Sequence, residues 1–229
     1  MDPRQTMKLR PRSWNWDGRW PGSGWLDGFS RDLPAVWEAG LTEDGPTLSK
    51  LTSPLSVEER TTLERFRGRE DQKRFLIGRG LLRLLIGAHM GMPVQEVEFI
   101  YGPAGKPRLA RRPGVPALHF NVAHSGKLVL LAFHPAREVG VDVEEMRTHR
   151  DQEGIAERVF TAREFEDWKR LNPSERYPAF YRLWTRHEAR LKTLGVGFSG
   201  DSNPAENRVT LFDLELAEGY QGAVGWLRD

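Results

Sequence analysis

The alternation of hydrophobic and polar residues predicts two successive sets of short strands and amphipathic helices. In the first set we expect a weak strand at residues 35–41, a helix from Ser56, a longer helix over about 71–89 and a strand at 97–101. Ser56 and Glu59 have the spacing of a capping box at a helix N-terminus. Gly91 is suited to end the longer helix, because glycine readily adopts the left-handed conformation of helix C-termini.

The second set follows the proline-rich residues 111–116. Three apolar runs at 118–122, 128–133 and 139–144 are separated by short turns, which predicts three consecutive strands in an antiparallel meander. Helices are expected at about 151–171 and 174–194, and a last strand at 209–216. Each set combines helices with a small sheet, so the predicted fold class is α+β.

We divide the chain into a Trp-rich N-terminal arm (1–33), an N-terminal α+β subdomain (34–116) and a C-terminal α+β subdomain (117–229). The arm contains four tryptophans, at positions 14, 16, 20 and 25, among proline, glycine, arginine and aspartate. It has neither helical nor strand periodicity, so we expect irregular structure. Its tryptophans either pack on the main body, or the arm is disordered.

Composition narrows the function classes. With 38% hydrophobic and 29% charged residues, the chain is typical of a soluble globular protein, and no apolar run is long enough to cross a membrane. The N-terminal residues lack the apolar core of a signal peptide, so we expect a cytoplasmic protein without membrane contact. The absence of cysteine excludes disulfides, thiolate metal sites and thiol nucleophiles. A formal net charge of +2 without dense basic runs disfavours dedicated nucleic-acid binding.

Two carboxylate motifs in the second half are the candidates for chemistry. Asp142 and Glu144 alternate with valines, so on a strand both carboxylates share the face opposite the valines. Glu188 and Lys192 are four residues apart and share one face of a helix. Such carboxylates can hold a hard divalent cation, with the lysine suited to a phosphate on that cation. The plainer interpretations are solvated residues on an open sheet face and an ordinary helix ion pair.

A longer series of motifs occurs in a fixed order. It comprises Leu55–Arg60, Arg65–Arg74, Tyr101–Pro107, Phe120–Gly126, Val139–Glu144, Val159–Glu164, Phe180–Trp184, His187–Lys192 and Gly195–Phe198. In this order the chain resembles the Sfp-type 4′-phosphopantetheinyl transferases over about residues 35–216. The resemblance implies two similar subdomains related by pseudo-twofold symmetry, each a small antiparallel sheet with packed helices. It also implies coenzyme A in the cleft between them.

The implied reaction is Mg²⁺-dependent transfer of 4′-phosphopantetheine from coenzyme A to a serine hydroxyl of an apo acyl or peptidyl carrier protein, releasing 3′,5′-ADP. By the family pattern, Asp142, Glu144 and Glu188 would bind the Mg²⁺. Glu188 would deprotonate the serine directly or through water, unless a water on the ion acts as base. Lys192 would stabilise the departing phosphate, beside His187 as a further catalytic candidate.

The residues carried over as coenzyme A contacts lie in the loop, the hairpin and two helices. They are Arg74, Tyr101, Gly105, Lys106, Asn121, Ala123, His124 and Lys192. Lys106 and His124 would meet phosphates, and Gly105 would let the backbone approach the nucleotide closely. Arg74 is equally well explained as a solvated helix residue.

Three positions depart from the family pattern. His187 stands where lysine is frequent, so activity should fall as pH rises through the histidine titration if this side chain touches the phosphates or the carrier. Ala123 replaces a serine and removes one hydroxyl contact to coenzyme A. Thr62 stands where a basic phosphate-binding residue is usual, with Arg60 or Arg65 as candidate substitutes.

The implied partners are small, acidic, helical carrier proteins. The segment Arg147–Arg170, rich in arginine and containing Phe160, Phe165 and Trp168, is a candidate contact surface. It is equally consistent with an amphipathic helix pair packed on its own core. Because both subdomains lie in one chain, we expect a monomer.

Overall fold

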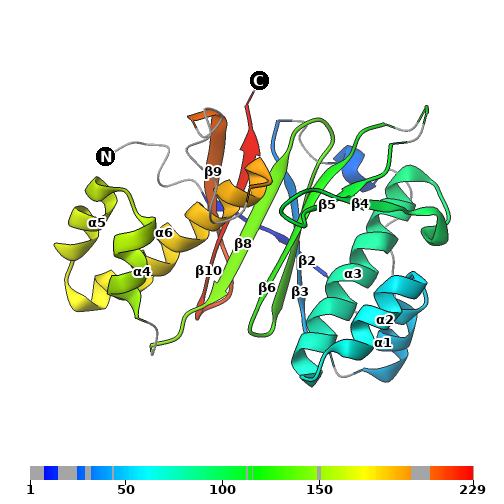
Figure 1. Ribbon diagram of the computed structural model, residues 1–229, viewed down its shortest axis with the longest axis horizontal. Helices are drawn as coiled ribbons and strands as arrows, with labels where there is room; N and C mark the ends of the chain where they lie inside the picture. Colours follow the sequence, from blue (N-terminus) through cyan, green and yellow to red (C-terminus); the bar gives the residue numbers. More distant parts are fainter. Residues whose placement is uncertain are drawn as a thin grey trace.

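The computed structural model describes residues 8–14, 25–28, 32–42, 44–111, 113–114, 116–148, 151–196 and 207–228. Two four-stranded sheets lie next to each other, with the long helix α3 against the first sheet and α6 against the second (Figure 1). Trp16, Trp20 and the last two residues of the motif at 195–198 lie outside the described ranges. Within those ranges, no helix combines the length and apolar character needed to cross a membrane.

The first half of the chain contains both short and long elements. These are β1 (Lys8–Leu9), β2 (Arg12–Ser13), the 3₁₀ helix η2 (Trp25–Gly28), β3 (Ala35–Gly40), α1 (Gly45–Thr52), α2 (Val57–Arg65), α3 (Arg69–Met90), η3 (Val94–Glu96), β4 (Phe99–Tyr101) and β5 (Pro107–Leu109). The capping box of Ser56 and Glu59 is confirmed at the start of α2. Gly91 ends α3 with a φ of 62°, also as predicted. Helix α1 was not predicted.

The second half contains β6 (His119–Ser125), β7 (Leu128–His134), β8 (Val139–Glu145), α4 (Gln152–Val159), α5 (Ala162–Lys169), α6 (Pro173–Leu194), β9 (Val209–Leu214) and β10 (Tyr220–Leu227). The helix predicted at 151–171 is two helices, because Thr161 forms a capping box that begins α5. Strand β10 was not predicted.

Both sheets repeat one topology. A strand is followed by a long helix and a hairpin, as β3, α3, β6–β7 and as β8, α6, β9–β10, and the last strand lies in the middle. The predicted α+β class with two similar halves is therefore confirmed. The sheets are mixed rather than antiparallel, because β1 adds to β9 in parallel and β2 adds to β3 in parallel.

The predicted meander of β6, β7 and β8 is wrong. Strand β7 pairs with β6 and β3, whereas β8 pairs with β10 along its whole length. Strands β6 and β8 are edge strands of different sheets and lie side by side (Figure 1). The alternation of a strand indicates which residues share a face but not which strand is its neighbour. The division predicted after residue 116 precedes β6, whereas sheet pairing groups β6 and β7 with the first half.

The N-terminal arm connects the two sheets. Strand β1 pairs with β9 in the second sheet, and β2, three residues later, pairs with β3 in the first. The described part of the arm is thus not irregular as expected. Packing of its tryptophans on the body is confirmed for Trp14 and Trp25, which both contact the ring of Trp37. Trp25 also donates a 2.7 Å hydrogen bond from Nε1 to the carbonyl of Leu85.

Three buried apolar clusters hold these layers together. One lies between α3 and the first sheet, and one joins α4, α5 and α6. The third contains the valines of β8 together with side chains from β3, β6, β7, β9 and β10, so it lies between the two sheets. The valine face of β8 is therefore buried as predicted, and α6 covers the opposite face.

Helix α6 lies close to β8 because Gly140 has no side chain. A Cβ atom at Gly140 would collide with the backbone of Ala189 and Thr193. Gly225 in the neighbouring β10 is similar, since its Cβ would lie 2.9 Å from Thr193 Oγ1. These glycines set the short distance between the helix and the strand that carry the predicted chemistry.

Substitution of Gly140 by alanine should therefore destabilise the protein by about 1–3 kcal/mol, because the new methyl group meets backbone that has no room to move. The free energy of unfolding from urea titration measures this. Gly40→Ala is the matched control, since Gly40 ends strand β3 and a Cβ there meets nothing within 4 Å. Equal stability of the two variants would refute the packing argument.

Candidate active site

Strands β6 and β8 are joined by side chains. Asn121 Oδ1 accepts a 2.9 Å hydrogen bond from the backbone N–H of Val141, and Ser125 Oγ accepts one of 3.0 Å from the N–H of Glu145. Both acceptors belong to β6 and both donors to β8. These bonds fix the register of the two edge strands, so the end of β6 that carries His124 lies beside the carboxylates of β8.

Asp142 is buried beneath α6, which excludes its interpretation as a solvated residue on an open sheet face. Its Oδ1 accepts a 2.6 Å hydrogen bond from Lys192 Nζ. Its Oδ2 has no hydrogen-bond partner among the described residues. Burial raises the pKa of Asp142 to about 7 even though Lys192 opposes the shift, and the charges of Glu144 and Glu188 add to it.

Glu144 and Glu188 complete a cluster of carboxylates. Glu144 accepts hydrogen bonds from Ser125 Oγ at 2.9 Å and from Trp184 Nε1 at 3.4 Å. Glu188 Oε1 is buried and has no hydrogen-bond partner within the described ranges. Burial raises the pKa of Glu188, Lys192 opposes this shift, and Glu144 reinforces it. The strand and the helix thus bring three acidic groups into one electrostatically coupled site, as the sequence indicated.

The donor set has the chemistry of a site for a hard divalent cation. Asp142 and Glu188 each present a buried oxygen without a partner, and buried polar atoms of this kind normally have one. However, as the side chains stand, no group of three or more His, Cys, Asp or Glu residues in the described chain is arranged to hold a metal ion. Lys192 instead neutralises Asp142. The residues therefore fit a cation in donor chemistry, while their present contacts form an ion pair.

Arg74 and His124 lie together at the β6–β7 turn. Arg74 Nη1 donates a 2.6 Å hydrogen bond to the carbonyl of Gly126, and its Nη2 pairs with Asp71 at 2.7 Å, so Arg74 supports the turn rather than being simply solvated. Desolvation lowers the pKa of the exposed His124, and the positive charges of Arg74 and Lys192 lower it further. These three basic side chains lie near one another at the end of the β6–β8 seam, the line along which the two edge strands meet, where Asp71 and Asp142 balance the charges of Arg74 and Lys192.

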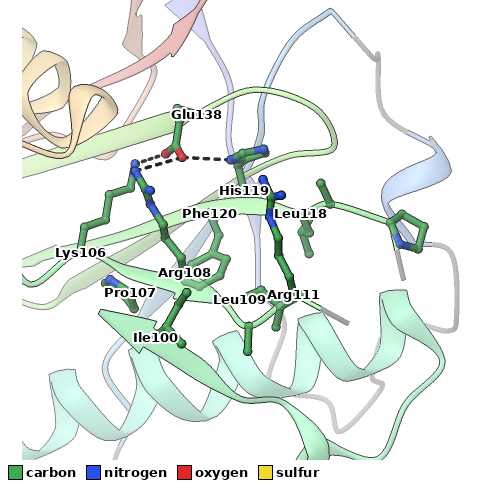
Figure 2. A pocket seen from close by; sticks show the side chains of 13 residues that line it. Ile100, Lys106, Pro107, Arg108, Leu109, Arg111, Leu118, His119, Phe120 and Glu138 are labelled. Atoms are coloured by element: carbon green, nitrogen blue, oxygen red, sulfur yellow. Dashed lines mark hydrogen bonds and ion pairs between the residues drawn. The ribbon is translucent and has the colours of Figure 1, made fainter. Parts of the chain in front are cut away.

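Three residues predicted to contact coenzyme A have side chains engaged with the protein itself. Asn121 bonds to β8, as described above. Ala123 is buried among the valines of β8. Lys106 Nζ donates to Glu138 Oε2 at 2.8 Å (Figure 2). It also donates to the carbonyl of Val139 at 2.9 Å. The structure does not bring Lys106 to the carboxylate cluster.

Tyr101 and Gly105 lie in the β4–β5 hairpin. Tyr101 is 59% exposed. Gly105 has a φ of 75°, which favours glycine, and the space where a Cβ would stand is open. Hydrogen bonds from Gly105 N to Gly102 O and from Gly102 N to Lys106 O close the turn. The loop can therefore present its backbone to a ligand, as predicted.

Tyr101 also lines a cavity of about 600 Å³ bordered by α2 and α3. Thr62 and Arg79 line the same cavity, and Arg79 Nη1 is buried without a hydrogen-bond partner among the described residues. Arg60 instead donates to the carbonyls of Leu55 and Ser53 next to its own helix. Arg79 is therefore better placed than Arg60 to supply the positive charge beside Thr62, and sequence reasoning missed it.

His187 belongs to a different surface from Glu188. With Arg190 and Leu183 it lines a groove of about 610 Å³ bordered by α5 and α6. Two of the aromatic residues considered for carrier contact do not form an exposed surface. Phe160 and Trp168 are buried in the core of α4, α5 and α6. These two aromatics stabilise the helix pair itself.

Sequence reasoning also missed Ser125 and Trp184, the two residues that hold Glu144. A signal for Ser125 was present. Residues two apart on a strand share a face, so Ser125 shares the β8-facing side of β6 with Asn121 and Ala123. No comparable signal pointed to Trp184, whose contact depends on how α6 packs.

Comparison with known proteins identifies the class. Residues 42–136 match the family described as 4′-phosphopantetheinyl transferase, N-terminal, and residues 138–220 match the 4′-phosphopantetheinyl transferase superfamily. The boundary between these matches falls between β7 and β8, where the sheets also divide.

Curated relatives agree with these matches. The chain is 36% identical over 164 residues to 4′-phosphopantetheinyl transferase HetI of Nostoc sp., covering 72% of this chain and 69% of the relative. It is 33% identical over 150 residues to 4′-phosphopantetheinyl transferase Sfp of Bacillus subtilis, covering 66% and 64%. A mouse L-aminoadipate-semialdehyde dehydrogenase-phosphopantetheinyl transferase is 28% identical over 177 residues, covering 73% and 57%. The chain belongs to the 4′-phosphopantetheinyl transferase superfamily and is an enzyme of that class.

Ser125→Ala should disturb the orientation of Glu144 without removing any carboxylate, because Glu144 loses the hydrogen bond from Ser125. If Glu144 is a ligand of Mg²⁺, the Mg²⁺ concentration for half-maximal activity should rise about 10-fold, the usual effect of losing a hydrogen-bond partner of a metal ligand. Titration of activity with Mg²⁺ measures this. Ser13→Ala is the control, since Ser13 donates to Glu38 at an exposed position. The same Mg²⁺ dependence in both variants would contradict a role for Ser125.

Proposed function

We propose that this transferase moves 4′-phosphopantetheine from coenzyme A to a serine hydroxyl of an apo acyl or peptidyl carrier protein, uses Mg²⁺ and releases 3′,5′-ADP. The observation that carries the proposal is the cluster of the buried Asp142 with the half-buried Glu144 and Glu188, in which Lys192 contacts Asp142. Family membership supplies the transferred group, and the cluster supplies the chemistry that splitting a pyrophosphate requires.

Asp142, Glu144 and Glu188 would hold the Mg²⁺, since hard cations of this kind prefer carboxylate oxygens. Mg²⁺ held by these residues would supply positive charge to the pyrophosphate. Burial raises the pKa of Asp142, and the charges of Glu144 and Glu188 add to this shift, so a positive charge beside Asp142 favours its charged form. Lys192 provides that charge now, and would turn to the departing phosphate once Asp142 has another partner.

Glu188 is the proposed general base for the carrier serine. Burial raises the pKa of Glu188, and a carboxylate with a raised pKa is a stronger base. General-base help of this kind contributes typically ~10²–10⁴-fold to a rate. The free Oε1 of Glu188 can accept the proton directly or through a water molecule.

Coenzyme A would lie along the β6–β8 seam, from the end that carries His124 to the β4–β5 hairpin. Its phosphates would meet the basic side chains of Arg74, His124 and Lys192. Its nucleotide would lie beside the β4–β5 hairpin, where Tyr101 and the backbone at Gly105 are exposed. This orientation follows from charge, because this end of the seam combines the three basic side chains with the acidic cluster.

The carrier protein would approach over α4 and α5, with an acidic surface facing exposed arginines such as Arg158 and Arg163. Arg147 contributes less to this surface, because Glu145 already neutralises it. Since one chain provides both halves of the seam, we expect a monomer to be active.

The direct test is incubation of the protein with coenzyme A, Mg²⁺ and an apo carrier protein, followed by mass spectrometry of the carrier. We expect a mass gain equal to phosphopantetheine that depends on Mg²⁺. Asp142→Asn and Glu188→Gln should each reduce the rate by about 100-fold or more, since each removes a charge from the site. Glu218→Gln, at an exposed loop position, should transfer normally. Full transfer by Asp142→Asn would refute the proposed metal site.

Coenzyme A affinity should depend on pH through His124. Its pKa is held low in the free protein by desolvation, Arg74 and Lys192, although a backbone hydrogen bond and Asp71 oppose this, whereas bound phosphates favour the charged imidazole. Binding then takes up a proton, so affinity should rise as pH falls from about 8 to about 6. Calorimetry with His124→Asn should show a weaker pH dependence.

His89→Asn is the control for that titration, because His89 packs beside Trp25 in a different part of the first half. Its coenzyme A affinity should follow the same pH profile as the unmodified protein. If His124→Asn retains the full pH dependence, His124 does not meet the phosphates.

A further inference from the structure

Lys106 joins the two halves of the molecule at the end of the seam opposite His124. It precedes β5, and its side chain is only 7% exposed. Its Nζ donates to Glu138 Oε2 at 2.8 Å, to the carbonyl of Val139 at 2.9 Å and to the carbonyl of Thr193 at 3.5 Å. An ammonium group has three protons to donate, so these contacts use all of them.

Glu138 gathers three cationic or polar groups, as Figure 2 shows. Besides Lys106, it contacts Arg108 Nη2 at 3.2 Å and His119 Nδ1 at 3.3 Å. Burial alone would raise the pKa of Glu138, but the hydrogen bond from His119 and the charges of Lys106 and Arg108 lower it to about 2. The carboxylate therefore remains charged and ties β5 and β6 to the residue that precedes β8.

The other two acceptors of Lys106 connect this cluster to the site. Val139 begins β8, three residues before Asp142, and Thr193 directly follows Lys192 near the end of α6. Lys106 thus binds the start of the strand and the end of the helix whose charged side chains meet in the 2.6 Å contact between Lys192 and Asp142. Substitution of Lys106 should therefore alter the contact between Lys192 and Asp142.

We propose that Lys106 and Glu138 are a positioning pair, which holds the β4–β5 hairpin, β8 and the end of α6 together so that Lys192 reaches its place. This differs from the expectation that Lys106 meets a phosphate of coenzyme A. A buried ammonium whose protons are all engaged has no donor left for a phosphate, and freeing one would leave Glu138 with one partner fewer. The proposal rests on the proposed function for its kinetic readout.

The test compares Lys106→Met, Glu138→Gln and the double variant. If the pair positions Lys192, each single variant should lower kcat about 10-fold or more and change the KM for coenzyme A little, because misplaced catalytic groups reduce turnover. The double variant should lose no more than Lys106→Met alone, because the two residues act on Lys192 as one unit. Glu215→Gln, which breaks the exposed pair with Arg10, is the matched control and should leave kcat unchanged.

A phosphate contact predicts the opposite pattern. Lys106→Met would then raise the KM for coenzyme A with kcat retained, the double variant would keep that defect, and Glu138→Gln would bind coenzyme A no more weakly. If the pair had a purely structural role, each single variant would have a lower free energy of unfolding, and the kcat of the folded variant would be unchanged. Either pattern would overturn the proposal.

Hydrogen exchange gives a readout that needs no turnover. Backbone amides at residues 190–196 and 139–142 should exchange faster in both single variants, and no faster in the double variant than in Lys106→Met. Unchanged exchange would overturn the proposal. Failure of the unmodified protein to modify a carrier protein would refute only the proposed function. Should a single variant not fold, Glu138→Asp, which keeps the charge, should show the same changes in smaller degree.

Discussion

The close contact between α6 and β8 is the constraint on which the active site depends. Gly140 lets the helix backbone lie directly on the strand, and this brings Lys192 of the helix to Asp142 of the strand in a buried position. At that depth the interactions between charges are strong, and burial raises the pKa values of Asp142 and Glu188. A more distant helix would leave the same residues as separate, solvated charges with ordinary properties.

The seam between β6 and β8 shows how one strand serves both structure and chemistry. Asn121 and Ser125 replace a backbone ladder by side-chain bonds to β8, while His124, between them in sequence, faces the other way toward Arg74. The Ser125 hydroxyl also fixes Glu144, so one residue aligns the strands and orients a carboxylate. Residues read from sequence as ligand contacts can therefore be residues that build the cleft.

The predictions made from local sequence patterns agree with the structure. The capping box at Ser56, the glycine that ends α3 and the placement of Asp142 and Glu188 on a strand and a helix all follow from short-range rules, and the structure has them. The errors concern long-range choices. Alternation did not reveal that β8 pairs with β10. Nor could spacing show that Lys106 is engaged by Glu138, since those residues lie 32 positions apart. The sequence shows which residues are charged, whereas the partners of those charges follow only from the fold.

The arm that joins the two sheets bears on the order in which the molecule assembles. Its ion pair between Arg10 and Glu215 spans 205 positions, and β1 pairs with β9 beside it. During synthesis the first sheet can form from β3, β6 and β7, but β1 has no partner until β9 has left the ribosome. Contacts of such sequence separation are slow to form. Closure of the arm is thus a late event, and nascent chains would expose an unpaired strand to chaperones until then.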